Sequence, residues 1–309
     1  MHLTLTATSE DQGQRIDAWL AAHAEVVTRS AAAKLLETGG VTVNGQPAAK
    51  NYRLRGDETV EVVRPEAEET SVTAQDIPLD VVYEDADVIV VNKPAGLAVD
   101  GPEDDTLLNR ALLYLNQQGE YKENDLYTPA LCHRLDTGTS GLVILAKTPE
   151  AEQLFLEVIK NREVKKTYLC VTFGRPVPPD GTLGGYLLKD ADRGIVKIVE
   201  DKQPGAKDVE TQYETIAVSG RLALLKVRLI TGRTHQIRAQ FSSRGLPPLG
   251  DVRYGSRDPG CDCALWSFHL RFVHPVTGKE VEVFRRPPEA YPWNRFPDGA
   301  LAPGGEPCP

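Results

Sequence analysis

The residues best suited to chemistry in this chain are an arginine and an aspartate two positions apart, directly before an apolar strand. Arg134 and Asp136 are followed at residues 137–141 by small and hydroxyl-bearing residues, a composition typical of a tight turn. Residues 142–146 are apolar and are predicted to form a strand. A carboxylate fixed between a turn and a strand suits an attacking group better than one on a mobile loop. Asp136 is therefore the first catalytic candidate, although an isolated Arg-x-Asp is more often a surface ion pair.

A second concentration of charge lies in residues 221–257, where eight cations accompany one acid, Asp251. The cations are Arg221, Lys226, Arg228, Arg233, Arg238, Arg244, Arg253 and Arg257. The whole chain has 35 Lys and Arg against 44 Asp and Glu, a formal net charge of -9, which argues against binding nucleic acid through overall charge. Any nucleic-acid contact must use a local basic surface, and this stretch is the predicted one.

Length and composition indicate an ordinary globular protein. With 309 residues and 41% hydrophobic content, the chain is long enough for two domains or one large one. It has no run of about 18 apolar residues, and its first residues lack the basic and apolar regions of a signal peptide. We therefore expect a cytoplasmic protein without a membrane segment.

The five cysteines are an odd number in a long chain, which favours free thiols over a disulfide framework. Cys261 and Cys263, together with His269 and His274, could be written as a zinc site. Their spacing falls outside the common zinc-finger pattern, and the histidines lie in an alternating apolar segment. Strand packing is the favoured interpretation of these residues.

The first 65 residues are predicted to form a separate small domain, because they contain a complete set of elements followed by a break in composition. Apolar residues around Trp19 have helical spacing, and a second helix is predicted over residues 30–38. Short strands are predicted over residues 41–46 and 60–63. An acidic linker follows, to which we assign residues 66–76.

Residues 77–297 are predicted to form the second domain. It begins with two strands joined by an acidic turn within residues 81–91, and a helix is predicted over residues 149–162. A strand over residues 165–171 and a hairpin that turns at Thr277 follow later in the chain. The tail contains Trp293 and Phe296 among prolines and could wrap over the domain, whereas residues 298–309 are expected to be disordered.

Residues 133–141 read His-Arg-Leu-Asp-Thr-Gly-Thr-Ser-Gly and resemble the active-site signature of the RluA family of RNA pseudouridine synthases. Residues 81–97 resemble the first motif of this family, residues 231–238 its third motif, and residues 249–255 extend the match. The Thr-Gly pair after the aspartate is a less usual filling of two variable positions. The resemblance implies an α+β fold: a catalytic domain around a mainly antiparallel, bifurcated sheet, with a small α/β S4-like domain before it.

The resemblance also implies roles for individual residues. Asp136 would be the catalytic carboxylate, acting on a uridine whose glycosidic bond is broken and remade from carbon 5 of the base. Arg238 would pair with it, and a guanidinium there favours the ionised carboxylate even when RNA excludes water. Tyr168 would stack on the target base and share in proton movement, while Arg134 would fill the space that the flipped base leaves or hold a phosphate. Further RNA contacts are predicted from His133, Arg233 and His235.

Lys93, Pro94 and Gly96 of the first motif would shape the floor beneath the catalytic loop. We interpret them mainly as ordinary turn residues.

Four stretches of the first domain, residues 28–30, 34–36, 40–45 and 54–57, resemble an S4-like RNA-binding domain. The family role of such a domain is to grip structured RNA. Its predicted phosphate contacts are Arg29, Lys34, Lys50, Arg53 and Arg55. Residues 1–66 contain 7 cations and 9 acids, so these side chains are equally consistent with a solvated surface.

The predicted reaction needs no cofactor or metal, and the chain has no Gly-x-x-x-x-Gly-Lys-Ser/Thr phosphate loop. The expected partner is structured RNA, with large-subunit ribosomal RNA favoured and transfer RNA left open; no obligate protein partner is evident. One alternative is a non-catalytic RNA-binding or ribosome-assembly factor, which the presence of Asp136, Tyr168 and Arg238 disfavours. Another is a retaining nucleoside hydrolase, which would need a second carboxylate that the motif does not offer.

Overall fold

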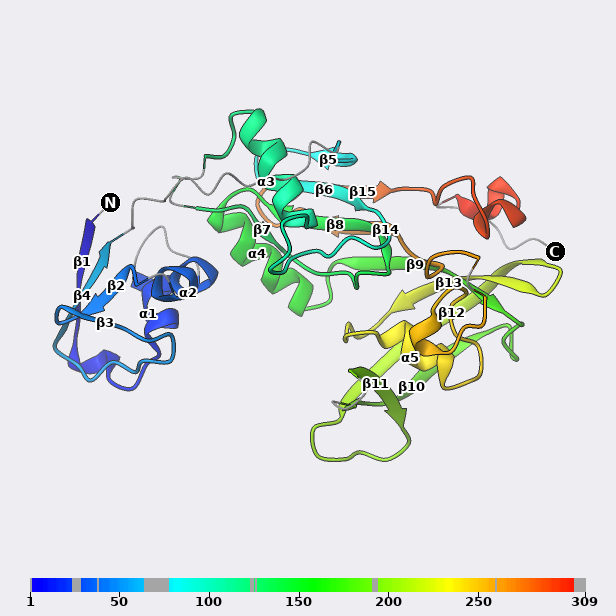
Figure 1. The fold of residues 1–309 in the computed structure, drawn as a ribbon, viewed down its shortest axis with the longest axis horizontal. Helices are drawn as coiled ribbons and strands as arrows, with labels where there is room; N and C mark the ends of the chain where they lie inside the picture. The colour runs from blue at the N-terminus through cyan, green and yellow to red at the C-terminus, as the bar shows by residue number, and fades with distance from the viewer. Residues whose placement is uncertain are drawn as a thin grey trace.

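The computed structural model describes residues 2–23, 29–37, 39–63, 78–122, 125, 127–190, 194–258 and 260–302. They form two units, each with its own sheet and its own hydrophobic core (Figure 1). No helix among these residues is long and apolar enough to span a membrane.

The N-terminal unit is a four-stranded antiparallel sheet in the order β1-β4-β2-β3, accompanied by two α-helices. Its strands are β1 (His2–Ala7), β2 (Val41–Val43), β3 (Gln46–Pro47) and β4 (Glu58–Val63), and its helices are η1 (Ser9–Asp11), α1 (Ile16–His23) and α2 (Arg29–Glu37). The predicted helices and strands are confirmed. Trp19 and Leu20 of α1 are fully buried in a core that contains only residues of this unit.

The second unit is built on an 11-stranded sheet in the order β11-β10-β12-β13-β9-β14-β8-β6-β5, with β15 paired to β14 and β7 paired to β8. Its strands are β5 (Val81–Glu84), β6 (Val88–Lys93), β7 (Ala130–Leu131), β8 (Ser140–Ala146), β9 (Lys165–Phe173), β10 (Asp180–Asp190), β11 (Ile195–Val199), β12 (Lys207–Ser219), β13 (Leu222–Leu229), β14 (Leu265–Val273) and β15 (Glu280–Phe284). Every described pairing in it is antiparallel except that of β14 with β8.

The sheet divides at β14. One side of this strand pairs with β9, whereas its other side pairs first with β8, through Trp266 and Ser267, and then with β15 from His269 onward. The mainly antiparallel, bifurcated sheet of an α+β fold is thereby confirmed. The loop before β8, which contains Asp136, lies next to this fork.

Gly141 makes the fork possible. Its φ is +107°, a backbone conformation that residues with a side chain rarely adopt, and an added Cβ would overlap the backbone of Ser267. The glycine of the signature therefore lets β8 and β14 approach closely, and it fixes the end of the loop that carries Asp136.

The helices cover both faces of the sheet. They are α3 (Leu107–Gln117), α4 (Pro149–Lys160), α5 (Gln236–Ser242), η2 (Val252–Tyr254), η3 (Trp293–Arg295) and η4 (Asp298–Leu301). Along β8, Val143 and Leu145 share a core with α3 and α5, whereas Leu142 and Ile144 share one with α4. Because successive side chains of a strand point to opposite faces, α3 and α5 lie on one side of the sheet and α4 on the other.

The C-terminal segment differs from the expectation of disorder beginning at residue 298. Residues 298–301 form η4, and Ala300 and Leu301 are buried in the same core as Trp266 and Trp293. Apolar burial holds this segment on the domain even though its composition is rich in proline and glycine. Residues 303–309 and the predicted linker, residues 66–76, lie outside the described residues.

Candidate active site

Asp136 is held in a short loop whose backbone is hydrogen-bonded on both sides. Its carbonyl accepts the N–H of Thr139 at 2.9 Å, and the next carbonyl, that of Thr137, accepts the N–H of Gly96 at 2.9 Å and the ammonium group of Lys93 at 3.0 Å. The Asp136 side chain is 22% exposed. The carboxylate is thus fixed in position while a substrate can still reach it.

Arg238 on α5 joins two carboxylates. Its Nη1 donates to Asp136 Oδ2 at 3.0 Å, while its Nε and Nη2 donate to the two oxygens of Asp251 at 2.7 and 2.9 Å. Burial works against the positive charge, but the hydrogen bonds and charges of Asp251 and Asp136 outweigh it and raise the pKa of the guanidinium. The predicted pairing of Arg238 with Asp136 is present in the structure.

His235 approaches the other oxygen of the same carboxylate. Its Nε2 lies 3.7 Å from Asp136 Oδ1, and its Nδ1 lies 2.9 Å from the hydroxyl oxygen of Tyr254. That oxygen accepts the N–H of Val196 at 3.1 Å, so its proton can point to Nδ1 and leave the imidazole proton on Nε2, toward Asp136. Burial lowers the pKa of His235, against the pull of Asp136, which favours the neutral ring.

Tyr254 supports this arrangement from η2. Its ring lies beneath Arg238, with the guanidinium carbon 4.9 Å from the ring centroid, and packs edge-on against His235. The same side chain therefore contacts both groups that flank the Asp136 carboxylate.

Tyr168 lies on β9, the strand beside the fork, and is 5% exposed. Burial, together with the negative charge of Asp136, raises the pKa of its hydroxyl. The group is therefore protonated at neutral pH and able to donate a hydrogen bond. The charge of Asp136 thus acts on the Tyr168 hydroxyl, and the role of Tyr168 in the site stays a prediction.

Lys93 is fully buried beneath the loop. Its ammonium group donates to the carbonyls of Pro94, Leu97 and Thr137 at 2.9, 2.7 and 3.0 Å. Burial lowers its pKa to about 8, although the charge of Asp136 opposes the shift. Lys93 thus does more than an ordinary turn residue, because it binds the carbonyl directly after Asp136.

The predicted RNA contacts of the second domain divide into two groups. Arg134 is exposed, with its guanidinium paired to Asp100 at 2.8 and 3.0 Å, and Arg233 is also exposed. His133 instead faces the interior: its Nε2 accepts the N–H of Ile144 at 3.2 Å, and its Nδ1 is buried. This geometry favours a role for His133 in fixing the loop to β8 and gives no support to the predicted RNA contact.

Three of the five cations predicted in the S4-like domain have described side chains. Lys50 is paired with Glu37 at 2.7 Å, Arg53 donates to the carbonyl of Gly13 at 2.6 Å, and Arg55 is exposed. The side chains of Arg29 and Lys34 lie outside the described part of the structure. Phosphate binding by these residues stays a prediction.

The cysteines and histidines of the possible zinc site do not converge. Cys263 precedes β14 and His274 follows it, so the nine residues of this strand, at about 3.3 Å per residue, separate them. His269 lies within the strand, with its Nε2 2.8 Å from Glu282.

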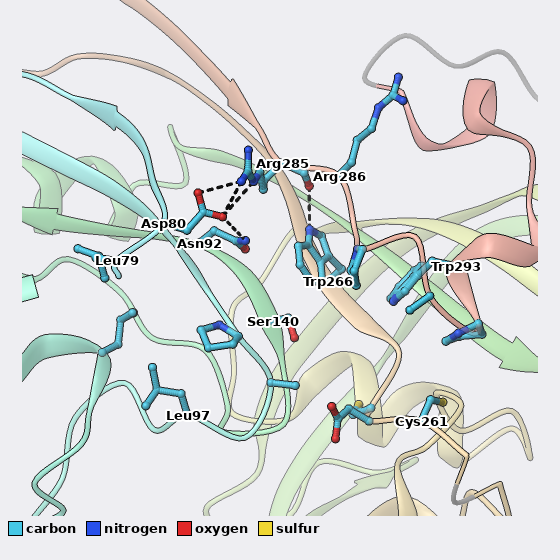
Figure 2. A pocket seen from close by; sticks show the side chains of 18 of the residues that line it. Leu79, Asp80, Asn92, Leu97, Ser140, Cys261, Trp266, Arg285, Arg286 and Trp293 are labelled. Carbon is cyan, nitrogen blue, oxygen red and sulfur yellow. Dashed lines mark hydrogen bonds and ion pairs between the residues drawn. The ribbon is translucent and has the colours of Figure 1, made fainter. Parts of the chain in front are cut away.

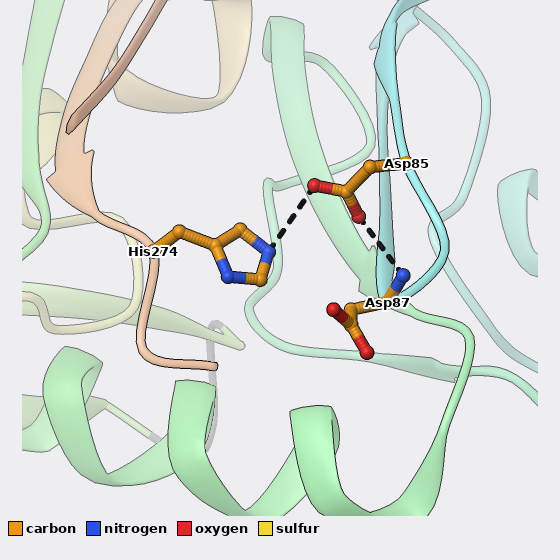
Figure 3. Close-up of side chains that lie close together, drawn as sticks. All are labelled: Asp85, Asp87 and His274. Carbon is orange, nitrogen blue, oxygen red and sulfur yellow. Dashed lines mark hydrogen bonds and ion pairs between the residues drawn. The ribbon is translucent and has the colours of Figure 1, made fainter. Parts of the chain in front are cut away.

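His274 belongs instead to a cluster with Asp85 and Asp87 (Figure 3). Its Nδ1 accepts the N–H groups of Val276 and Thr277, which leaves a proton on Nε2, 3.3 Å from Asp85 Oδ2. A nitrogen that carries a proton cannot bind a metal. The cluster is therefore an Asp–His contact that ties the end of β14 to the turn between β5 and β6.

A cavity of about 980 Å³ lies beside the catalytic loop rather than at Asp136 (Figure 2). Ser140, Cys263 and Trp266 line it. Within it, Asp80 accepts hydrogen bonds from Arg285 and from the amide group of Asn92. The cavity lacks a convergent set of reactive groups, so the chemistry is assigned to the Asp136 cluster.

The sequence indicated no role for Asp251 or Tyr254, and it placed Lys93 in the floor beneath the catalytic loop without indicating that its ammonium group is buried. Asp251 and Tyr254 both lie in residues 249–255, which extend the match to the family motif, but the match gives them no function. The available signal was that Asp251 is the sole acid among eight cations in residues 221–257.

Comparisons with known proteins agree with this geometry. A family model described as RNA pseudouridylate synthase matches residues 87–243, and an S4 domain model matches residues 14–60. The uncharacterised RNA pseudouridine synthase YlyB of Bacillus subtilis is 33% identical over 287 residues, which cover 91% of this chain and 92% of that protein. Ribosomal large subunit pseudouridine synthase D of Vibrio vulnificus is 33% identical over 302 residues, covering 91% and 90%.

Solved structures show the same fold. Human RNA pseudouridylate synthase domain containing 1 superposes with a TM-score of 0.57 at 26% identity, covering 73% of this chain and 88% of that one. Human RNA pseudouridylate synthase domain containing 4 gives a TM-score of 0.58 at 22% identity, covering 68% and 88%. Since the matched family model spans Asp136, Tyr168 and Arg238, and relatives align along nearly the whole chain, this protein belongs to the RluA family of RNA pseudouridine synthases, isomerases that convert uridine to pseudouridine in RNA.

Proposed function

We propose that this enzyme isomerises specific uridines of large-subunit ribosomal RNA, with Asp136 as the catalytic carboxylate. The observation that carries the proposal is the Asp136 carboxylate itself, reachable at 22% exposure and flanked by Arg238 on one oxygen and His235 on the other. Ribosomal RNA is favoured because relatives from several bacteria, at 32 to 34% identity, are named ribosomal large subunit pseudouridine synthase D.

The two domains have different functions in this proposal. The S4-like domain, residues 1–65, grips the folded RNA through a few exposed cations such as Arg55, and the second domain, from residue 77 onward, carries out the reaction. A local grip of this kind is consistent with a chain whose formal net charge is -9.

The reaction begins with extrusion of the target uridine, because a base within a helix cannot reach a half-buried carboxylate. Arg134 lies two residues before Asp136 and is exposed, so it is placed to leave Asp100 and either occupy the vacated stack or bind a phosphate. The flipped base then stacks on the ring of Tyr168 in this proposal, as the family resemblance implies.

Asp136 then acts on the ribose by one of two routes. In the first it attacks carbon 1 and displaces the base; in the second it removes a proton from carbon 2, so that a glycal forms as the base leaves. The freed base rotates and its carbon 5 bonds to carbon 1 of the ribose. In the first route this bond replaces the ester bond between Asp136 and carbon 1, and in the second the proton taken by Asp136 returns to carbon 2. The proton on carbon 5 is then lost, and N1 ends protonated. Deuterium at ribose carbon 2 would slow only the second route.

The neighbours of Asp136 serve both routes. Arg238 keeps the carboxylate ionised when RNA closes the site, because its charge remains after water has left. Tyr168 keeps its proton and donates it in a hydrogen bond to the displaced base or to the carboxylate. The atoms balance without an oxidant or a phosphate donor.

Tritium release from RNA labelled at uridine carbon 5 tests the proposal. We expect the wild-type protein to release tritium from unmodified large-subunit ribosomal transcripts and not from transfer RNA, and Asp136→Ala to release none. Release only from transfer RNA would overturn the substrate class. Free uracil would indicate hydrolysis, and tight binding without release would indicate an assembly factor.

A further inference from the structure

We infer that Asp251 is a positioning residue of the reaction, which orients Arg238 so that only one of its nitrogens meets Asp136. The inference rests on the proposed function in the sense that it takes Asp136 as the catalytic carboxylate. It adds a residue that acts through Arg238 and touches neither the base nor the ribose.

The hydrogen bonds of Arg238 show the arrangement. Asp251 is 2% exposed and takes the Nε–Nη2 edge of the guanidinium in two parallel hydrogen bonds of 2.7 and 2.9 Å. Such a bidentate pair fixes the plane of the guanidinium as well as its distance. Only Nη1 remains directed at Asp136, at 3.0 Å from Oδ2.

The consequence for Asp136 is that one oxygen is left for chemistry. A guanidinium free of Asp251 could turn its two-nitrogen edge to Asp136, since this is the preferred geometry for an arginine and a carboxylate. Both oxygens of Asp136 would then be engaged. With Asp251 in place, Arg238 binds Oδ2 alone. Among the described residues, Oδ1 has only the longer 3.7 Å contact with His235.

Charge leads to the same conclusion. One guanidinium shared by two carboxylates neutralises Asp136 less completely than an arginine devoted to it. A carboxylate that must attack or remove a proton benefits from this, because full neutralisation in a buried pair weakens its reactivity. Asp251 therefore fixes the orientation of the Arg238 guanidinium and reduces the extent to which its positive charge neutralises Asp136.

Asp251 is itself rigidly placed. Its carbonyl accepts the N–H groups of Tyr254 and Ser256, both at 3.0 Å, and its own N–H donates to the carbonyl of Pro248 at 3.0 Å. The preceding Gly250 has a φ of +76°, and a Cβ there would overlap the backbone of Cys261 and Asp262. The turn is thus closed around Asp251 on both sides, which suits a residue that must hold another side chain in place.

The first test is the steady-state kinetics of Asp251→Asn in the tritium-release assay. The amide keeps the size of the side chain but cannot accept two hydrogen bonds from the guanidinium. We expect kcat to fall about 100-fold with little change in KM, because a small misplacement of a catalytic group costs about this much. A kcat equal to that of the wild type would overturn the inference.

A matched control is available in Asp105, which also forms a bidentate pair with an arginine. Arg110 donates to its two oxygens at 2.7 Å each, and this pair does not include Asp136. Asp105→Asn removes one carboxylate in the same way, and we expect its kcat to stay within about twofold of the wild type. An equal loss in both variants would mean that breaking any such pair slows the enzyme, which contradicts a specific role.

A double-mutant cycle tests whether Asp251 acts through Arg238. Lysine carries its charge on a single nitrogen, so Arg238→Lys removes the two-nitrogen pairing with Asp251. We expect Asp251→Asn to cost far less in the Arg238→Lys background than in the wild type. If the fold-losses in kcat of the two single variants simply multiply in the double variant, the two residues act independently and the inference is contradicted.

Two outcomes separate the inference from the proposed function. If Asp136→Ala still releases tritium, the proposed function fails; if Asp136→Ala is inactive while Asp251→Asn is fully active, only the inference fails. Should Asp251→Asn not fold, Asp251→Glu keeps the charge but displaces the guanidinium, and a kcat loss in a folded protein would support the inference. Failure of both variants to fold would assign Asp251 to stability and overturn it.

Discussion

At the scale of single residues, Lys93 places a buried positive charge near Asp136, and this burial lowers the free energy of unfolding. The ammonium group is fully buried, and burial lowers its pKa from 10.5 to about 8. Between these two pH values the unfolded chain binds more protons than the folded chain. The contribution of Lys93 to the free energy of unfolding therefore rises as the pH rises through this window, and it falls as the pH drops toward 8.

This sign gives a prediction for Lys93→Met. We expect the stability of the wild type to increase relative to that of the variant by about 3 kcal/mol between pH 8 and 10.5, since each unit of pKa shift corresponds to about 1.4 kcal/mol. Urea unfolding of both proteins across this range measures the difference. Other titrating groups are common to the two proteins and cancel. Parallel pH profiles would show that Lys93 keeps its ordinary pKa.

The residues of the site were predictable to different degrees. The proposed site residues Asp136, Tyr168 and Arg238 could be named from motifs, although Arg238 is 102 positions from Asp136, to which it hydrogen-bonds. The burial of the Lys93 side chain could not be predicted, because lysine is almost never fully buried and the neighbouring residues in the sequence give no sign of it. The pairing of Asp251 with Arg238 could not be predicted, because the turn that directs the Asp251 side chain inward depends on contacts with residues 261–262.

At the scale of elements, the junction of β8 with β14 connects folding to the site. Gly141 adopts a positive φ there, and a Cβ would overlap the backbone of Ser267. The loop that carries Asp136 leads into β8 one residue before Gly141, so any widening of the junction also moves the Asp136 carboxylate. The glycine of the signature is therefore required by the sheet as much as by the loop.

We expect Gly141→Ala to destabilise the protein by about 2 kcal/mol or more, because a non-glycine residue in this conformation costs about 1–2 kcal/mol before the overlap is counted. Urea unfolding measures the loss. Gly138→Ala is the matched control in the same loop, since its Cβ would make only an ordinary 3.6 Å contact with Cys263. Equal stability of the two variants would refute this account of the fork.

Some helices and strands could be predicted from patterns in the sequence alone, and others could not. The hairpin of β14 and β15 and the helix α4 were predicted because their apolar periodicity is regular. No strands were predicted over residues 180–229, where β12 buries Thr211 between Val209 and Tyr213, so that polar residues weaken the alternation. The order of the last segment depends on Trp293 packing against Trp266, a contact between distant parts of the chain.

At the scale of the whole molecule, a negatively charged protein must bind RNA through a few cations. Arg55 is exposed in the S4-like domain, and we expect Arg55→Ala to raise KM without changing kcat. The dependence of log affinity on log salt should become less steep by about 0.7–0.9, the value for one lost phosphate contact. Filter binding at several salt concentrations measures the slope. Lys279→Ala, at an exposed turn of the second domain, serves as the control, and equal slopes in both variants would exclude the contact.

The most direct test of the central claim compares the wild type with Asp136→Asn in tritium release from large-subunit ribosomal transcripts labelled at uridine carbon 5. Asparagine preserves the shape of the side chain but can neither attack the ribose nor remove its proton. We predict that the wild type releases the tritium of its target uridines and that the variant releases none, with both proteins folded and bound to the RNA. Release by Asp136→Asn at the wild-type rate would contradict the assignment of the reaction to this carboxylate.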